Sequence, residues 1–561
     1  MTSVLRTFWK CSMALLMLLS LICFDLVGQD GEDLQPVSDT YAITHATIIQ
    51  APGRKLEGGT VVISKGLITA VGSSVNIPAD AVIINGDSMF VYAGFIDGYS
   101  HIGVPKPKEE RAEPVKYPGD PPPDRAGITP HLDVRDFLAP ADRSVEEFRN
   151  AGFTTAQVVP HGNLLPGQAA IILLAGNTAD EMVVVKNAAL YSELTGASRM
   201  YPSTIMGVMA KWRELYRQAM QARSYQANYS ANPTGLERPN TNRVLEAFYP
   251  VIDQRMPVLM RAQDVLEIQR VLTLKKDLGF QLMMGDIKEA WPVIDQVKAS
   301  GGKIFLSLDL PEGVKKEDKK DTKEGQTMTT AERESLEKRK AEAIARYESQ
   351  AAAFSKAGIS FGFSANSVKG KDVHANLRRM IAAGLSEDVA LAALTTNPAQ
   401  LLGLSSRMGT VDNGKVANLV VTDKPYFAEK AKIKVVFVDG KKFNVDTKEA
   451  PKTNGKRPAI SGSWSYTTET PQGSGIGRIS LKDEGGAITG SISSSYNGQT
   501  SEIKDASLVG NSLTFYYSMD AGGTEIKIDV VLKIEDDTFE GTLTAGQFGS
   551  FPMKGTKDPK N

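Results

Sequence analysis

The spacing of apolar and polar residues changes from one region of the chain to the next. Short β-type runs separated by glycine-containing turns fill residues 41–92 and predict a small β-domain. From residue 93 onward, strand-like runs alternate with amphipathic helical stretches, such as a helix expected at 144–151 before a strand at 152–159. Alternation of this kind over roughly 300 residues predicts a parallel (β/α)8 barrel. A further long helix is expected from a capping box at 329–332 to about Lys356.

A different pattern follows a Pro-, Asn- and Gly-containing linker at 448–458. Short strands separated by Gly or Asn turns predict an antiparallel β-meander or partly closed barrel of about 100 residues. The expected strands lie at 475–481, 487–492, 502–508, 512–518, 524–532 and 538–543.

The N-terminus has the pattern of an export signal. Arg6 and Lys10 precede an apolar run at 13–24, and small or apolar residues lead to Gly28. This arrangement predicts a secretory signal peptide that is cleaved after Gly28. We therefore expect a periplasmic or secreted protein with no integral membrane span after cleavage. A lipid anchor on Cys23 is not expected, because the preceding Ile22 is bulky.

Composition narrows the function classes. The chain has 561 residues, 42% of them hydrophobic, and a formal net charge of −1, which indicates a globular protein of several domains and gives no reason to expect a nucleic-acid partner. Both cysteines, Cys11 and Cys23, fall in the signal segment. Thiol catalysis is therefore not expected in the mature protein.

One stretch relates these patterns to a known family. Residues 91–103 read Val-Tyr-Ala-Gly-Phe-Ile-Asp-Gly-Tyr-Ser-His-Ile-Gly. They resemble the first barrel strand of the amidohydrolase superfamily, whose pattern is Pro-Gly-Phe-Ile-Asp-x-His-x-His. There the two histidines lie two residues apart, so both project to one face of the strand and share a metal. His101 matches the second histidine, and Tyr99 stands in place of the first.

Two later segments extend the resemblance. Residues 408–423 resemble a β-sandwich segment that reads Gly-Lys-x-Ala-Asp-Leu-Val-Val, with Asn418 in the Asp position, and residues 373–399 are similar to the helical run that closes the barrel. The resemblance spans about residues 41–443 and implies a (β/α)8 barrel that carries a split β-sandwich. The expected domains are a signal peptide at 1–28, a composite sandwich at 29–92 and 408–447, the barrel at 93–407, the linker at 448–458 and a C-terminal β-domain at 459–561.

The resemblance also implies where the metal ligands of the family would lie. Arg261 and Met284 stand where family members have histidines, and Asn366 stands where they have the aspartate that is also the general base. An amide loses the charge of that carboxylate and cannot accept a proton near neutral pH, and a permanently cationic arginine opposes a divalent metal. No histidine occurs between residues 162 and 373, so only His101 remains of the expected set.

Candidate binding residues follow from the same alignment, because the loop after the strand at 152–159 faces substrate in the family. They are Tyr99, His101, His161, Asn163, Arg261 and Asn366. A rebuilt metal site is an open alternative, since His101, His131 and His161 all follow strand-like segments and three imidazoles can hold zinc.

Three functions remain open. The family activity is metal-dependent hydrolysis of carbon–nitrogen, non-peptide bonds, and with its metal site largely lost the chain is expected to be a weak or inactive binding subunit, with an active paralogous amidohydrolase as a candidate partner. In this case no cofactor is expected. The rival is a working hydrolase with zinc at a site around His101. The third is a secreted protein that binds a small molecule through its C-terminal β-domain.

Overall fold

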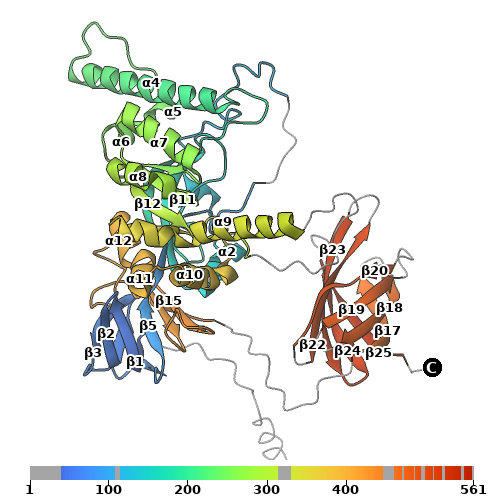
Figure 1. The fold of residues 1–561 in the computed structure, drawn as a ribbon. Helices are drawn as coiled ribbons and strands as arrows, with labels where there is room; N and C mark the ends of the chain where they lie inside the picture. Colours follow the sequence, from blue (N-terminus) through green and yellow to red (C-terminus); the bar gives the residue numbers. More distant parts are fainter. Residues whose placement is uncertain are drawn as a thin grey trace, which may run out of the picture. The chain divides into compact units, whose positions relative to one another are not determined.

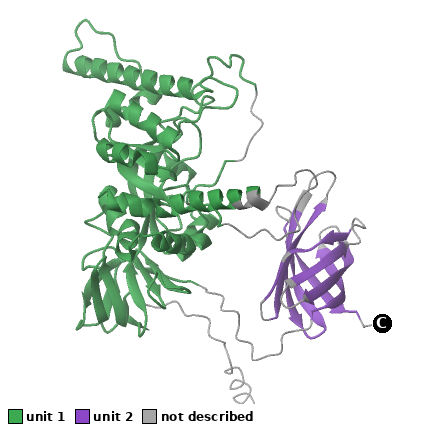
Figure 2. Ribbon diagram, in the orientation of Figure 1, with its two compact units in different colours: residues 1–445 green, residues 446–561 purple. Residues whose placement is uncertain are grey.

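The computed structural model describes residues 39–107, 114–313, 330–445 and 460–558, except for short gaps at 471–472, 485–486, 495–499, 510, 521–524 and 545–548. The predicted signal peptide and the linker at 448–458 lie outside the described residues. The chain divides into two compact units, residues 1–445 and 446–561 (Figure 2). Among the described helices, none combines the length and the apolar character needed to cross a membrane.

The centre of the first unit is a closed barrel, as predicted. Its interior is filled by large side chains, among them Tyr99, Tyr191 and Phe305, which are all fully buried. In chain order the barrel strands are β6 (Phe95–Ser100), β7 (Phe153–Val158), β8 (Gly167–Leu173), β9 (Val183–Ser192), β10 (Val258–Arg261), β11 (Leu282–Ile287), β12 (Lys303–Ser307) and β13 (Phe361–Ser364).

The barrel departs from the expected (β/α)8 order at one strand. β8 runs antiparallel to both of its neighbours, β7 and β9, whereas the other neighbouring pairs are parallel. The loop 159–166 between β7 and β8 is too short for the crossover of about a dozen residues that parallel strands need. The prediction of an all-parallel barrel is therefore wrong at β8.

Helices cover the barrel from outside (Figure 1). Ser386 caps α11 through a hydrogen bond from the backbone N–H of Val389, and α9 ends at Lys356, where its end was predicted. The helices are α2 (Arg143–Asn150), α3 (Ala179–Met182), α4 (Ile205–Ala231), α5 (Arg243–Glu246), α6 (Tyr249–Ile252), α7 (Val265–Leu278), α8 (Ile294–Ser300), α9 (Thr330–Lys356), α10 (Val373–Ala382), α11 (Glu387–Leu394) and α12 (Thr396–Leu401).

The two ends of the first unit meet in one mixed sheet. β14 pairs with β5, and Leu419 lies opposite Ala93, so the segments before and after the barrel share one sheet. It is a single eight-stranded sheet around its own apolar core, rather than two separate layers. Its strands are β1 (Tyr41–Ala51), β2 (Arg54–Ser64), β3 (Leu67–Gly72), β4 (Val82–Asn85), β5 (Phe90–Ala93), β14 (Leu419–Thr422), β15 (Ile433–Val438) and β16 (Lys441–Asn444).

The second unit is an antiparallel meander in which the first strand pairs with the last, β17 with β25. Trp464, Phe539 and Met553 are buried in its own core. Its strands are β17 (Gly462–Thr470), β18 (Gly473–Glu484), β19 (Ala487–Ser494), β20 (Thr500–Glu502), β21 (Lys504–Val509), β22 (Ser512–Asp520), β23 (Glu525–Glu535), β24 (Thr538–Thr544) and β25 (Ser550–Lys557).

Candidate functional site

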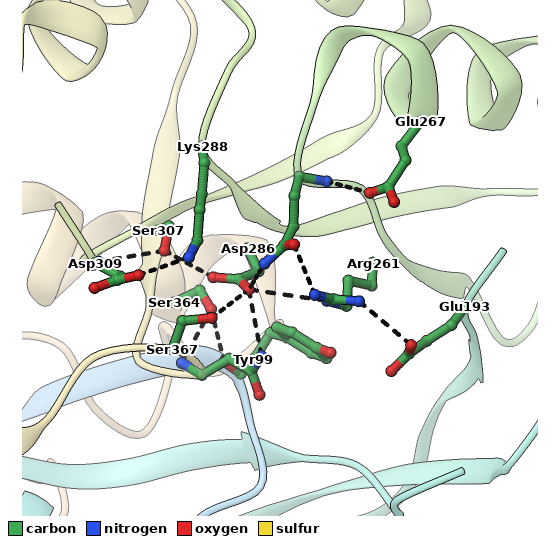
Figure 3. Close-up of polar contacts among 12 residues, drawn as sticks. Tyr99, Glu193, Arg261, Glu267, Asp286, Lys288, Ser307, Asp309, Ser364 and Ser367 are labelled. Atoms are coloured by element: carbon green, nitrogen blue, oxygen red, sulfur yellow. Dashed lines mark hydrogen bonds and ion pairs between the residues drawn. The ribbon is translucent and has the colours of Figure 1, made fainter. Parts of the chain in front are cut away.

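Polar side chains gather where the parallel barrel strands end (Figure 3). The carboxyl ends of barrel strands carry the active sites of enzymes with this architecture. Arg261 and Ser307 are the last residues of β10 and β12, and Asp286 is next to last in β11. Glu193 directly follows β9, and Asn366 lies two residues beyond β13.

Asp286 is the centre of the polar network. It is fully buried, and its Oδ1 accepts a hydrogen bond of 2.7 Å from the Ser307 hydroxyl. Its Oδ2 accepts from Gln263 Nε2 at 2.7 Å, from Ser367 Oγ at 2.8 Å and from Asn366 Nδ2 at 3.3 Å. Its backbone has a φ of 60°, a strained region for a residue with a side chain. The surrounding donors therefore fix a buried anion in one position.

Arg261 lies between this carboxylate and a second one. Its Nη1 is 3.4 Å from Glu193 Oε2, its Nε is 4.0 Å from Asp286 Oδ2, and its Nη2 donates to Gln263 Oε1 at 2.7 Å. Burial is the main cause that raises the pKa of Glu193, while hydrogen bonds from Tyr191 and Arg261 oppose this rise. The guanidinium thus forms a cationic bridge between the ends of β9 and β11.

Two tyrosines connect this bridge to the barrel interior. The Tyr99 and Tyr191 hydroxyls are 2.6 Å apart, and Tyr191 donates to Glu193 Oε1 at 2.5 Å. Burial raises the pKa of both hydroxyls well above the usual value. A Cβ on Gly285 would come within 2.8 Å of the Tyr99 ring, so the glycine makes room for the tyrosine that replaces the first family histidine.

Asp97 is a third buried carboxyl group in this region. Its Oδ1 accepts from the backbone N–H groups of Ala365 at 2.7 Å and Tyr99 at 3.3 Å, whereas its buried Oδ2 has no hydrogen-bond partner among the described residues. Burial raises the pKa of Asp97 from 3.8 to about 7, and the hydrogen bonds offset only part of that effect. This residue is therefore poised between its neutral and charged forms near pH 7.

His101 and His161 form a stacked pair. Their ring centroids are 3.8 Å apart with an interplanar angle of 16°. His101 Nδ1 lies 2.9 Å from the Val159 carbonyl oxygen, and His161 Nε2 lies 2.9 Å from that of Val104. Burial, and then the neighbouring His161, lowers the pKa of His101 to about 4, and burial also lowers the pKa of His161. Both rings are therefore mainly neutral at pH 7.

The structure separates the remaining expected site residues from this group. His131 is exposed and Asn163 lies against Gly127 in the β7–β8 loop, and in the described part of the chain no polar contact joins either side chain to Arg261 or Asp286. Met284 packs in the core outside the barrel, so its assignment to a family ligand position is wrong. The strand pairing places Gly285 opposite Arg261, and a shift by one residue reverses the face on which a side chain lies.

The donor set does not fit the metal of the family. Tyr99 is bonded to Tyr191, Arg261 supplies a fixed positive charge, and the amide of Asn366 donates to Asp286. In the described ranges, no three His, Cys, Asp or Glu side chains are grouped in a way that could hold a metal ion. The stacked imidazoles present their lone pairs in nearly parallel planes, a poor arrangement for a shared tetrahedral ion.

Sequence reasoning missed six residues of the network, Tyr191, Glu193, Gln263, Asp286, Ser307 and Ser367. A signal for Asp286 was present, because an acidic residue that follows the apolar run 282–284 after one glycine marks a strand end. Glu193 also follows an apolar run, but no strand end was predicted near it, so its position at a strand end was not visible.

Comparisons with known proteins agree with the fold. Residues 318–446 match the Amidohydrolase family. The amidohydrolase tasK of Hapsidospora irregularis is 29% identical over 119 residues, which are 20% of this chain and 12% of that protein. A solved amidohydrolase structure from Thermotoga maritima MSB8 is 22% identical and covers 72% of this chain and 100% of its own, with a TM-score of 0.58.

Proposed function

We infer from the amidohydrolase superfamily, to which this chain belongs, that its barrel is a binding module which has lost the metal-dependent hydrolysis of its relatives. The activity that this superfamily implies is hydrolysis of carbon–nitrogen bonds, for which a bound metal supplies an activated hydroxide. The observation that carries the proposal is the position of Arg261 between Glu193 and Asp286. A protein cation already lies between the carboxylates at the strand ends.

Two further features support loss of the hydrolytic chemistry. Asn366 replaces the expected general base with an amide that takes up no proton near neutral pH. The ring of His101 stacks on His161, with the ring centroids 3.8 Å apart. The rival function, a hydrolase with a zinc site at His101, His131 and His161, has no support in this geometry, because His131 is exposed and stands apart from the stacked pair.

Export of this chain and its assembly with an active paralogous amidohydrolase subunit remain parts of the proposal. A binding subunit needs the scaffold but not the metal, which fits a barrel kept intact around a changed site. Co-purification of the full chain with such a paralogue is the expected result, and a chain that is isolated alone from its native source contradicts the assembly.

The C-terminal unit is a second candidate for ligand binding. It contains a hollow of about 1070 Å³ that is lined by aromatic residues such as Tyr466 and Phe539 and by charged residues such as Arg478 and Lys554. If this hollow binds the ligand, deletion of residues 462–561 removes binding while the barrel still folds. Binding that survives the deletion assigns the ligand to the first unit.

Zinc content tests the proposed function. After dialysis against zinc and then against buffer, elemental analysis is expected to find less than about one-tenth of an equivalent, since a lone imidazole holds the ion weakly. Hydrolysis of amides and cyclic amides by the same sample is expected to equal that of His101→Ala. Retention of about one equivalent that is lost in His101→Ala, together with hydrolysis, would instead establish a rebuilt catalytic site.

A further inference from the structure

We propose that the carboxyl end of the barrel binds a small organic cation that donates N–H hydrogen bonds, such as an amidinium, guanidinium or primary ammonium compound. This inference rests on the proposed function as a binding module and names the chemical class of its ligand. Its basis is that some hydrogen-bonding groups of the site bond to other protein groups, whereas others have no partner among the described residues.

The stacked histidines leave two acceptors open. A carbonyl oxygen can only accept, so the hydrogen bonds to Val159 and Val104 fix the ring hydrogen on Nδ1 of His101 and on Nε2 of His161. The other nitrogen of each neutral ring therefore holds a lone pair. Neither of these nitrogens has a protein partner in the part of the chain that the structure describes.

Two oxygens add to this excess of acceptors. Asp97 is fully buried, and its Oδ2, which is an acceptor when the group is ionised, lacks a partner among the described residues, as does the buried Oδ1 of Asn366. Buried polar atoms without a partner are rare and indicate a missing water or ligand. The amide of the buried Gln157 on β7 is also unpaired, but its oxygen and nitrogen add an acceptor and a donor alike. The surplus is therefore one of acceptors.

Several donors of the site already bond to acceptors of the protein. Arg261 donates to Glu193 and Gln263, the Ser307 and Ser367 hydroxyls and the Asn366 amide donate to Asp286, and Lys288 bonds Asp309 at 2.6 Å. A cationic ligand finds open lone pairs without breaking any of these contacts.

The net charge of the site also favours a cationic ligand. Glu193 and Asp286 together outweigh Arg261, and Lys288 is matched by Asp309. Lys106, whose charge contributes to the lowered pKa of His161, is exposed to solvent. The interior of the site is thus net negative, and Asp97 adds to this charge whenever it is ionised.

The histidine pair also connects spatially to the carboxylates. The His101 ring centroid is 6.2 Å from that of Tyr99 and 6.5 Å from that of Tyr191, whose hydroxyl contacts Glu193. A planar amidinium can therefore place its N–H groups toward the imidazole lone pairs and its charge toward the carboxylates.

Three probes of equal shape test the proposal. Acetamidinium, acetamide and acetate are planar and similar in size, but they carry a positive, zero and negative charge. In a titration of the full chain, acetamidinium is expected to bind about tenfold or more tightly than acetate, a difference of about 1.4 kcal/mol. Equal or tighter binding of acetate overturns the proposal, as does the absence of any binding by acetamidinium at millimolar concentrations.

Two variants locate the binding. His161→Phe keeps the stacked ring but removes the lone pair, and it is expected to weaken acetamidinium binding about tenfold. His374→Phe is the matched control, because His374 also bonds a backbone carbonyl, that of Tyr426, with a partly buried ring. Equal losses in the two variants contradict the proposed site.

A measurement on the unaltered chain avoids dependence on the folding of the variants. In ¹⁵N spectra of labelled histidine, acetamidinium is expected to shift the unprotonated nitrogens of His101 and His161 and to leave His131 and His374 unchanged. Unshifted His101 and His161 signals at saturation overturn the proposal. Zinc analysis of the same samples distinguishes failure of this proposal from failure of the proposed function. A zinc-free protein that prefers acetate contradicts only the cationic class of the ligand.

Discussion

Replacement of Arg261 by methionine is expected to destabilise the first unit by about 2–4 kcal/mol, because removal of one partner leaves buried charge uncompensated. The substitution leaves Glu193, with 16% of its side chain exposed, and the fully buried Asp286 without their shared cation. The loss of unfolding free energy is expected to stay below the upper end of the usual range for broken buried ion pairs, since the Arg261 side chain is itself 28% exposed and partly screened by solvent.

Urea denaturation compared with a matched variant measures this effect. Arg213 has a similar exposure, 26%, but its partner Asp277 is 35% exposed, so Arg213→Met is expected to cost less than about 1 kcal/mol. In the double variant with Glu193→Gln, part of the loss from Arg261→Met should return, because one of the stranded charges is gone. Equal losses in Arg261→Met and Arg213→Met would show that Arg261 does not hold the strand ends together.

The Asp97→Asn variant is expected to gain stability relative to the unaltered chain as the pH rises. The folded protein holds the proton of Asp97 up to a pKa of about 7, compared with 3.8 for the free side chain. Between these values the folded state binds more protons than the unfolded state, so the stability of the unaltered chain falls with rising pH. The full difference is at most about 4 kcal/mol, reached above pH 7.

Asparagine preserves the main structural contact, since its oxygen can still accept from the backbone N–H groups of Ala365 and Tyr99. Denaturant unfolding of both proteins at pH 5 and pH 8 measures the change. The stability of Asp97→Asn relative to the unaltered chain should be higher at pH 8 than at pH 5. The same difference at both pH values would mean that Asp97 does not take up a proton between pH 5 and pH 8.

Some features of the fold and the site could be predicted because they depend on residues that lie close together in the sequence. The apolar run at 91–103, the cap at Ser386 and the end of α9 at Lys356 depend on neighbouring residues, and the structure has them as expected. The resemblance also placed Tyr99, Arg261 and Asn366 at strand ends on the correct side of the barrel. The composite sheet was predictable because both of its halves carry β-type runs.

The remaining features depend on pairing and loop geometry. Met284 faces the outer core because the strand register puts Gly285 opposite Arg261, and the register is not visible in a single strand. The antiparallel β8 follows from the short loop 159–166, whose length was readable but was interpreted as part of a regular alternation. The contact between His101 and His161 is set by how that loop folds back, which no residue spacing specifies.

The most direct test of the central claim, that Arg261 and its carboxylates occupy the place of a catalytic metal, is anomalous diffraction from crystals of the full chain soaked in zinc. The account predicts no zinc peak within coordination distance, about 2.0–2.3 Å, of His101, His161 or Asp286, with Arg261 still between Glu193 and Asp286. A zinc peak bound to these side chains, with Arg261 displaced from the two carboxylates, would contradict it.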